Sequence, residues 1–226
     1  MKALEVLLDE AKATHGHVCA GQVLGVRMAM LGCRLVGIDD PKAPPNLKKL
    51  MVYVEIDRCA TDAIQSVTGC RMGKRTLKFR DYGINAATFL NLETGLAYRI
   101  ISTEESKKLA DAYAPEETDV SQKQLLGYQR MPDEVLFRIQ QVKVLLDELE
   151  MPGPSRRKSV CQRCGQVVRD GREIITEDKV LCQPCAGMAY FLPCVPNKSN
   201  PLLNQRIMDD DTNGDCGRGR QIAAGQ

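Results

Sequence analysis

The chain has 226 residues, a formal net charge of +2 and ten cysteines. Its length allows one core domain and a small appendage, and its hydrophobic fraction of 43% and charged fraction of 27% are ordinary for a soluble globular protein. No stretch approaches the roughly 18 apolar residues of a membrane span, so we expect no membrane partner. The cysteines fit a reducing compartment, where they remain thiols or metal ligands. We therefore expect a cytoplasmic protein.

The N-terminal segment is predicted to form two helices. Apolar residues among acids and a lysine over the first ten residues predict a short amphipathic helix that ends before Thr14. Residues 19–35 are apolar on adjoining faces, which predicts a buried helix. Gly21, Gly25 and Gly32 lower its intrinsic helicity but allow close packing against a sheet or against a second copy.

Strands and helices share the middle of the chain. Alternating β-branched and aromatic residues predict four strands, with a helix between the first and the second. The strands are expected at residues 51–56, 76–83, 86–92 and 96–102, and the helix at 59–70. After Ser102 the pattern becomes helical, with a start like a capping box at Thr103 and a long amphipathic helix from Pro132 to about Leu149.

These elements predict an α+β fold with a mixed or antiparallel sheet of about four or more strands flanked by helices, followed by a small four-cysteine zinc-binding domain. No internal repeat interrupts this order. We expect a core domain over residues 1–150, a linker over 151–158, a zinc-binding domain over 159–194 and a flexible tail over 195–226.

Four cysteines in the C-terminal part form the most diagnostic pattern. Two C-x2-C pairs, Cys161 with Cys164 and Cys182 with Cys185, are separated by 17 residues. This spacing lets two backbone knuckles present four thiolates to one tetrahedral metal ion, most often structural zinc. Such a closed site has no open position for a substrate, so it contributes folding energy rather than catalysis. A rubredoxin-like iron site and two disulfides are the alternatives.

Two further observations bear on this region. Disulfides imply an exported chain, but Glu5, Asp9 and Glu10 interrupt the apolar run that a signal peptide needs. Between residues 155 and 185, seven basic residues stand against four acidic ones, and a zinc ion held by four thiolates carries two negative charges. The region is therefore nearly neutral, and we do not expect a nucleic-acid partner.

The two histidines of the chain, His15 and His17, both lie within four residues of Cys19. Side chains at this spacing can converge on one metal ion, and the helix that begins beyond them is expected to favour the thiolate form of Cys19. Cys59 also stands where a strand gives way to a helix, which favours the thiolate. If the fold brings the two segments together, they form a mixed nitrogen and sulfur site with room for an exogenous ligand. The alternative is ordinary packing, which we expect for Cys33.

Gly69, Gly73 and Lys74 form only an incomplete phosphate loop. The spacing of the glycines is one residue short, and no Ser or Thr follows the lysine to meet magnesium. We therefore do not expect nucleotide hydrolysis. Lys74 is expected instead to hold an anionic substrate at the rim of a pocket.

The chain resembles the FmdE family of formylmethanofuran dehydrogenase subunits in three segments: HGHVCAG, EIDRCATDAIQSVTGCRMGKRTLKFRDYG and the ATF that follows. The similarity covers roughly residues 10–105, continues weakly to about residue 150 and includes the C-terminal zinc knuckle that some members append. The family's first motif usually has proline where this chain has Ala20. A lysine usually follows D-Y-G where this chain has Ile84.

The resemblance implies an α+β core that forms a homodimer, with a cleft lined by the His-x-His-x-Cys turn and by the cysteine after the first strand. It implies that His17 and Cys19 are metal ligands and that Cys59 completes the site or acts as a redox-active thiolate. His15 is a ligand or a proton carrier, so Cys59 and His15 are the catalytic candidates. Asp62 is placed to orient a histidine.

Further lining of the cleft and the function follow from the same resemblance. Asp81 and Tyr82, at the end of a strand, are expected to line the cleft beside Lys74. The expected function is a metal-binding subunit or accessory protein of a molybdenum or tungsten oxidoreductase of one-carbon metabolism and methanogenesis. The expected cofactors are structural zinc and a second zinc or other transition metal in the core. A metal-sensing protein or metallochaperone without catalysis, and a zinc-ribbon transcription regulator, are the alternatives.

Overall fold

The computed structural model describes residues 1–192, and these form two compact units that divide after Gly153. The expected tail over residues 195–226, and the last two residues of the expected zinc-binding domain, lie outside the described residues. Within residues 1–192 no helix is both long enough and apolar enough to cross a bilayer.

The first unit is built on a five-stranded mixed sheet with the order β2-β1-β3-β4-β5. Its strands are β1 (Leu50–Val54), β2 (Leu77–Phe79), β3 (Ala86–Asn91), β4 (Ala97–Ser102) and β5 (Phe137–Gln141). β1 and β2 are parallel and the other pairs are antiparallel. A parallel pair needs a crossover connection, and α3 (Cys59–Thr68) supplies it. The predicted α+β class and mixed sheet are confirmed.

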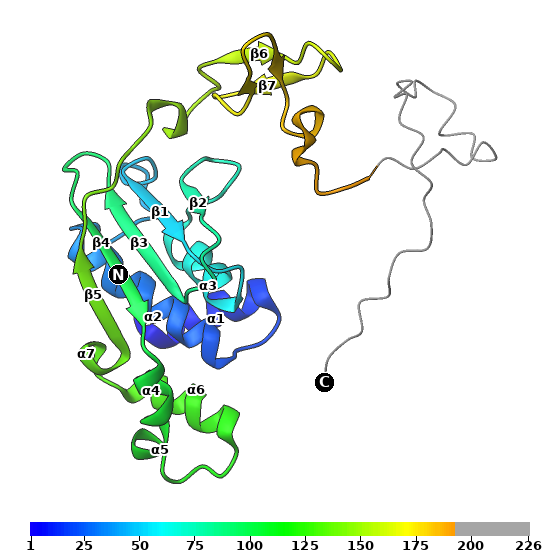
Figure 1. Ribbon diagram of the computed structural model, residues 1–226. Coiled ribbons are helices and arrows are strands. Elements are labelled where there is room, and N and C mark those ends of the chain that lie inside the picture. Colours follow the sequence, from blue (N-terminus) through cyan, green and yellow to red (C-terminus); the bar gives the residue numbers. More distant parts are fainter. Residues whose placement is uncertain (193–226) are drawn as a thin grey trace. The chain divides into compact units, whose positions relative to one another are not determined.

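Three helices cover one face of this sheet: α1 (Leu4–His15), α2 (Ala20–Leu35) and α3 (Figure 1). Strand residues that alternate toward this face, such as Val52, Phe89 and Ile100, are completely buried. The opposite face has a smaller apolar cluster around Met51 and Leu90. The main core therefore lies between the sheet and the three helices.

Glycines set the packing distance of α2. A Cβ atom at Gly25 would lie 2.3 Å from the carbonyl oxygen of Ala60 in α3, and one at Gly32 would lie 2.3 Å from the ring of Phe89 in β3. Neither separation is possible for a real side chain. α2 therefore touches both α3 and the sheet through bare backbone. The close contact with the sheet was predicted, whereas the contact with α3 was not.

The predicted end of the first helix is wrong by two residues. α1 continues through Thr14 to His15 and stops at Gly16, which has φ +96° and donates its N–H to the Lys12 carbonyl at 2.7 Å. A glycine in the left-handed conformation is a common helix terminator. His15 is therefore the last residue of α1 and lies directly before the turn that leads to α2.

The predicted long helix from Pro132 to Leu149 is also wrong. The segment forms one helical turn, α7 (Asp133–Leu136), then β5, and later the 3₁₀ turn η1 (Glu148–Glu150). Backbone pairing of β5 with the edge of β4 replaces the helix. Such pairing depends on a distant strand, so it overrides the local helical preference.

Three helices follow β4: α4 (Glu104–Lys108), α5 (Ala110–Tyr113) and α6 (Val120–Arg130). They gather beyond the end of the sheet where β4 finishes (Figure 1). The Thr103 hydroxyl caps α4 and the Asp119 carboxylate caps α6. Arg27 of α2 holds this group in place, because it donates to the Tyr128 carbonyl at 2.7 Å and to Asp133 at 2.6 Å.

The second unit consists of two small hairpins. β6 (Lys158–Val160) pairs with β7 (Val167–Arg169), and β8 (Ile174–Ile175) pairs with β9 (Val180–Leu181). A helical turn, η2 (Pro184–Met188), follows. The strands bury little, so hydrophobic packing alone gives this unit a small core.

Gly25→Ala tests the backbone contact between α2 and α3. We expect the free energy of unfolding to fall by about 1–3 kcal/mol, because the added methyl group forces the helices apart and this outweighs the gain in helix propensity. Gly73→Ala is the matched control, since a Cβ atom there meets nothing within 4 Å. Urea unfolding of both variants measures the difference. Equal stabilities would contradict the close approach.

Candidate functional site

Four sulfur atoms converge in the second unit. The ribbon cluster (Cys161, Cys164, Cys182 and Cys185) places its ligand atoms within 4.8 Å of one another. Cys161 follows β6 and Cys182 follows β9, so each hairpin delivers one C-x2-C knuckle. All eight cysteines among the described residues are free thiols, which leaves no disulfide in this region. The arrangement fits one metal ion held by four thiolates.

The backbone prepares part of this cluster for anionic sulfur. The pKa of Cys161 is lowered to about 6, mainly because the backbone N–H of Cys182 points at its sulfur and also because those of Cys164 and Arg163 do. Burial and the neighbouring sulfurs raise the pKa of Cys185. Four thiolates at this distance therefore need a cation to offset their charges.

An ion pair between a buried carboxylate and an exposed guanidinium supports the ribbon cluster, and the sequence analysis missed it. Glu173 is 8% exposed and pairs with Arg157, which lowers the pKa of the carboxyl group. Glu173 stands directly before β8, and Arg157 stands directly before β6. The pair therefore joins the starts of the two hairpins. An Arg and a Glu separated by 16 residues in a basic segment gave no pattern that could identify them.

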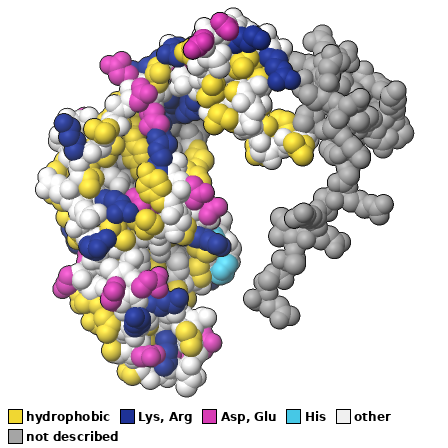
Figure 2. Space-filling view, viewed as in Figure 1, with side chains coloured by type: hydrophobic (Ala, Val, Ile, Leu, Met, Phe, Trp, Pro, Cys, Tyr) yellow, Lys and Arg dark blue, Asp and Glu magenta, His cyan; other side chains and the backbone are white. Residues whose placement is uncertain are grey.

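A second group of ligands lies in the first unit. The core cluster (His15, His17 and Cys19) places one ligand atom from each residue within 4.8 Å of the others. His15 ends α1, Cys19 stands at the N-cap of α2, and the left-handed Gly16 turns the chain between them. The imidazole rings are 4.9 Å apart between centroids. Histidine reaches the molecular surface as a cyan patch in Figure 2.

Asp62 orients one imidazole of the core cluster. It lies in the first turn of α3, and its carboxylate is 2.9 Å from Nδ1 of His15. When a carboxylate accepts a hydrogen bond from Nδ1–H of a neutral imidazole, Nε2 keeps its lone pair for a metal. His15 is thus held in the tautomer that a metal ligand requires.

Cys59 lies beside the core cluster rather than within the group of three. Its side chain contacts that of Cys19. Both cysteine side chains lie close to Gly21, in the first turn of α2. Burial raises the pKa of Cys59, and the adjacent Cys19 raises it further. The direction of this shift is opposite to the expectation that the helix start favours a Cys59 thiolate, and its main cause is burial.

Gln22 is a neighbour of this cluster that the sequence analysis missed. Its side chain is completely buried, and Nε2 donates to the Cys59 carbonyl at 2.7 Å. Its Oε1 atom is buried and has no hydrogen-bond partner. An unpaired buried carbonyl is costly, so this atom is suited to accept a hydrogen bond from a group that binds beside Cys59. With nitrogen and sulfur donors nearby, the residues fit a soft transition metal and its ligand.

A polar cavity of about 440 Å³ adjoins the core cluster. Its lining residues are Ala20, Gly21, Leu24, Gly83, Ile84, Asn85, Ser102, Thr103, Glu104, Lys107, Gln124 and Tyr128. Gly21 belongs to both sites, because it lines the cavity while a Cβ atom there would lie 3.1 Å from Cys59 Cβ and 3.7 Å from Cys19 Sγ. Ala20 and Ile84, where the chain departs from the family motif, both line this cavity.

The remaining residues of the expected pocket lie elsewhere. Lys74 is exposed in the turn after Cys70, near the start of β1, whereas the core cluster lies at the opposite end of α3. The structure therefore does not bring Lys74 to the cluster. Asp81 and Tyr82 are exposed at the correct end of the sheet, but the residues after them, Gly83 to Asn85, are the ones that line the polar cavity.

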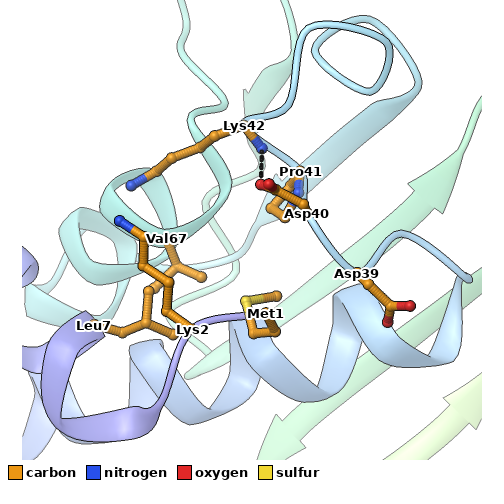
Figure 3. A pocket seen from close by; sticks show the side chains of 8 residues that line it. All are labelled: Met1, Lys2, Leu7, Asp39, Asp40, Pro41, Lys42 and Val67. Carbon is orange, nitrogen blue, oxygen red and sulfur yellow. Dashed lines mark hydrogen bonds between the residues drawn. The ribbon is translucent and has the colours of Figure 1, made fainter.

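A smaller cavity of about 170 Å³ lies near the N-terminal residues (Figure 3). Lys2 and Lys42 line it, and both pair with the Glu10 carboxylate. The Lys42 backbone N–H also donates to Asp40 at 3.2 Å. Its two lysines are therefore committed to a protein partner.

Cys164→Ser tests the ribbon cluster. We expect residues 154–192 to lose protection against amide hydrogen exchange while residues 1–153 keep theirs, because the metal supplies folding energy that the small hairpins lack. Exchange measured by mass spectrometry on the metal-loaded full chain gives the comparison. Gln183→Ser, an exposed change between two of the cysteines, is the control. Full protection in both variants would show that the four sulfurs do not stabilise this unit together.

Comparison with known proteins adds two relatives. A curated protein of Archaeoglobus fulgidus, described as a probable S-adenosyl-L-methionine-binding protein, is 26% identical over 81% of this chain and 53% of its own length. The chain thus spans about half of that relative. A crystal structure of an FmdE-like protein of the tungsten formylmethanofuran dehydrogenase type from Syntrophus aciditrophicus covers 84% of this chain and 96% of its own, with a TM-score of 0.55 and 19% identity. This likeness is one of fold.

The family match covers the functional region of the first unit. Residues 14–143 match the family described as FmdE, molybdenum formylmethanofuran dehydrogenase operon. This range includes the core cluster, Cys59 and every lining residue of the polar cavity, and it ends before the ribbon cluster. The chain belongs to the FmdE family.

Proposed function

We propose that this chain is a metal-binding subunit or accessory protein of an oxidoreductase system of one-carbon metabolism, of the formylmethanofuran dehydrogenase type. The observation that carries the proposal is the core cluster, in which His15, His17 and Cys19 present ligand atoms within 4.8 Å. Three ligands leave an open coordination position, which is typical of a metal that binds a substrate or a transferred group. The family membership agrees with this role.

The protein residues around the core cluster have distinct tasks in this proposal. A bound zinc or other transition metal supplies Lewis acidity. Asp62 keeps His15 in the required tautomer. Cys59 either completes the ligand set or serves as a redox-active thiol, and Gln22 fixes its backbone. His17 is exposed, so it can also exchange a proton with solvent.

The ribbon cluster has a structural role in the same proposal. Four cysteine ligands favour zinc, and a closed set of four leaves no position for a substrate. The zinc replaces the hydrophobic core that the short strands lack. Catalysis is therefore assigned to the first unit.

We also propose the setting in which the chain works. A thiol-rich chain without disulfides among its described residues suits the reducing cytoplasm. The family resemblance favours a homodimer that associates with a larger oxidoreductase complex. Light scattering of the purified chain tests the first step, since a monomer at micromolar concentration would contradict the homodimer.

A metallochaperone or metal sensor is the second candidate. It is favoured by the partial exposure of the core cluster, in which His17 is exposed and the other two ligands are half-buried. An ion in such a position can leave readily. Rapid transfer of the core metal to a competing chelator, together with no turnover on any electron donor, would favour this candidate over a role in catalysis.

Metal analysis of the Cys161→Ser/Cys182→Ser variant tests the core site directly. Disabling the ribbon cluster should leave one metal ion per chain, bound by the core cluster. Adding His17→Ala to this variant should remove it. If the ribbon variant already contains no metal after loading, the core site does not exist.

Asp62→Asn tests the positioning of His15. We expect the affinity of the core cluster for metal to fall about 10–100-fold, because the amide no longer selects the Nδ1-protonated tautomer. Asp57→Asn is the matched control, as Asp57 is exposed in the loop just before α3. Competition titrations with a chromophoric chelator measure both variants. Equal losses would indicate a general charge effect.

A further inference from the structure

We propose that the polar cavity binds a small zwitterion of the α-amino-acid type, one molecule that carries both a carboxylate and an ammonium group. The idea that this zwitterion is presented to the core metal rests on the proposed function. Its binding to the cavity can be measured without metal. The proposal starts from the two charged groups on the rim of the cavity, Glu104 and Lys107.

These two side chains have opposite charges and share one helix face. They are three residues apart on α4, a spacing that places side chains side by side. Both line the cavity, and among residues 1–192 neither forms an ion pair within 4.0 Å. By contrast, the lysines of the smaller cavity are paired with Glu10. The rim therefore offers one cation and one anion to a ligand.

The charge balance selects the class of ligand. A phosphate or another multiply charged anion would meet a single lysine and would be repelled by Glu104. A simple cation would be attracted by Glu104 but repelled by Lys107. A molecule with one charge of each sign satisfies both groups, so the paired charges favour a zwitterion.

The remaining lining supports a molecule of this size. Asn85 and Gln124 supply amide groups, each of which can donate and accept hydrogen bonds. Tyr128 is 4% exposed, and burial raises the pKa of its hydroxyl group. Leu24 and Ile84 provide an apolar wall for an aliphatic side chain. A volume of about 440 Å³ lies within the usual range for small-molecule sites.

The cavity is also placed to serve the core cluster. Its wall at Ala20 and Gly21 is the first turn of α2, which begins immediately after Cys19. Gly21 has no side chain between the cavity and the two cysteines, and a Cβ atom there would contact both. A ligand in the cavity therefore lies one helical turn of bare backbone from the proposed metal ligands.

Calorimetric titration of the full chain with L-valine and L-serine tests the inference. We expect binding of one molecule per chain. We expect at least about tenfold weaker binding of 3-methylbutanoate, which lacks the ammonium group of valine, and of isobutylamine, which lacks its carboxylate. No binding of either amino acid at millimolar concentration, or equal binding of the two half-molecules and valine, would overturn the proposal.

The same helix offers matched variants. Glu104→Gln and Lys107→Met should each weaken binding of the amino acid about tenfold or more. Glu105→Gln and Lys108→Met change neighbouring residues of α4 with the same charges that do not line the cavity, and they should leave the affinity within about twofold. Equal effects in the two sets would overturn the assignment of the rim.

Titrations of the metal-free chain and of the His17→Ala variant separate this inference from the proposed function. Amino-acid binding to both samples, together with no metal uptake by the core cluster of the unaltered chain, would uphold the cavity and reject the metal centre. Metal uptake without amino-acid binding would reject the cavity alone.

Discussion

The first unit depends on the contact between α2 and α3 at Gly25. Because the backbone of Ala60 occupies the space of a side chain there, the two helices are in direct backbone contact. Both helices begin at the same end of the sheet, so this contact also sets the separation of their first turns. Those turns carry Cys19 and Gln22 on one helix, and Cys59 and Asp62 on the other. The position of Cys59 and Asp62 relative to Cys19 and Gln22 is thus set by the packing of the two helices at Gly25 and Ala60.

The features that could be predicted from the sequence are those encoded by neighbouring residues. The ribbon cluster and the core cluster each follow from short spacings, and the strands follow from alternation over a few residues. The helix expected after Pro132 failed because β5 forms by pairing with β4, a partner more than 30 residues away. The pKa shift of Cys59 is opposite to the expected direction, and its main cause is burial, which only the fold reveals.

The polar cavity could not be predicted from the sequence. Its lining comes from α2, the loop before β3, the end of β4, α4 and α6, and none of these segments has a distinctive pattern by itself. Asp81 and Tyr82 were predicted to line the cleft. Asn85, which was not predicted, lies in the wall of the polar cavity instead. Ala20 and Ile84 were noticed only as departures from a motif. Both residues lie in the wall of the polar cavity.

The two thiol-containing sites differ in how the chain reaches them. The ribbon cluster is built by two hairpins of one small unit, whereas the core cluster joins the end of α1 to the start of α2 across the single left-handed residue Gly16. An ion that bridges His15 and Cys19 would bind only when α1 is docked. Metal occupancy and the local unfolding of the N-terminal helix are then thermodynamically linked. Opening of α1 would then separate His15 from Cys19 and release such an ion.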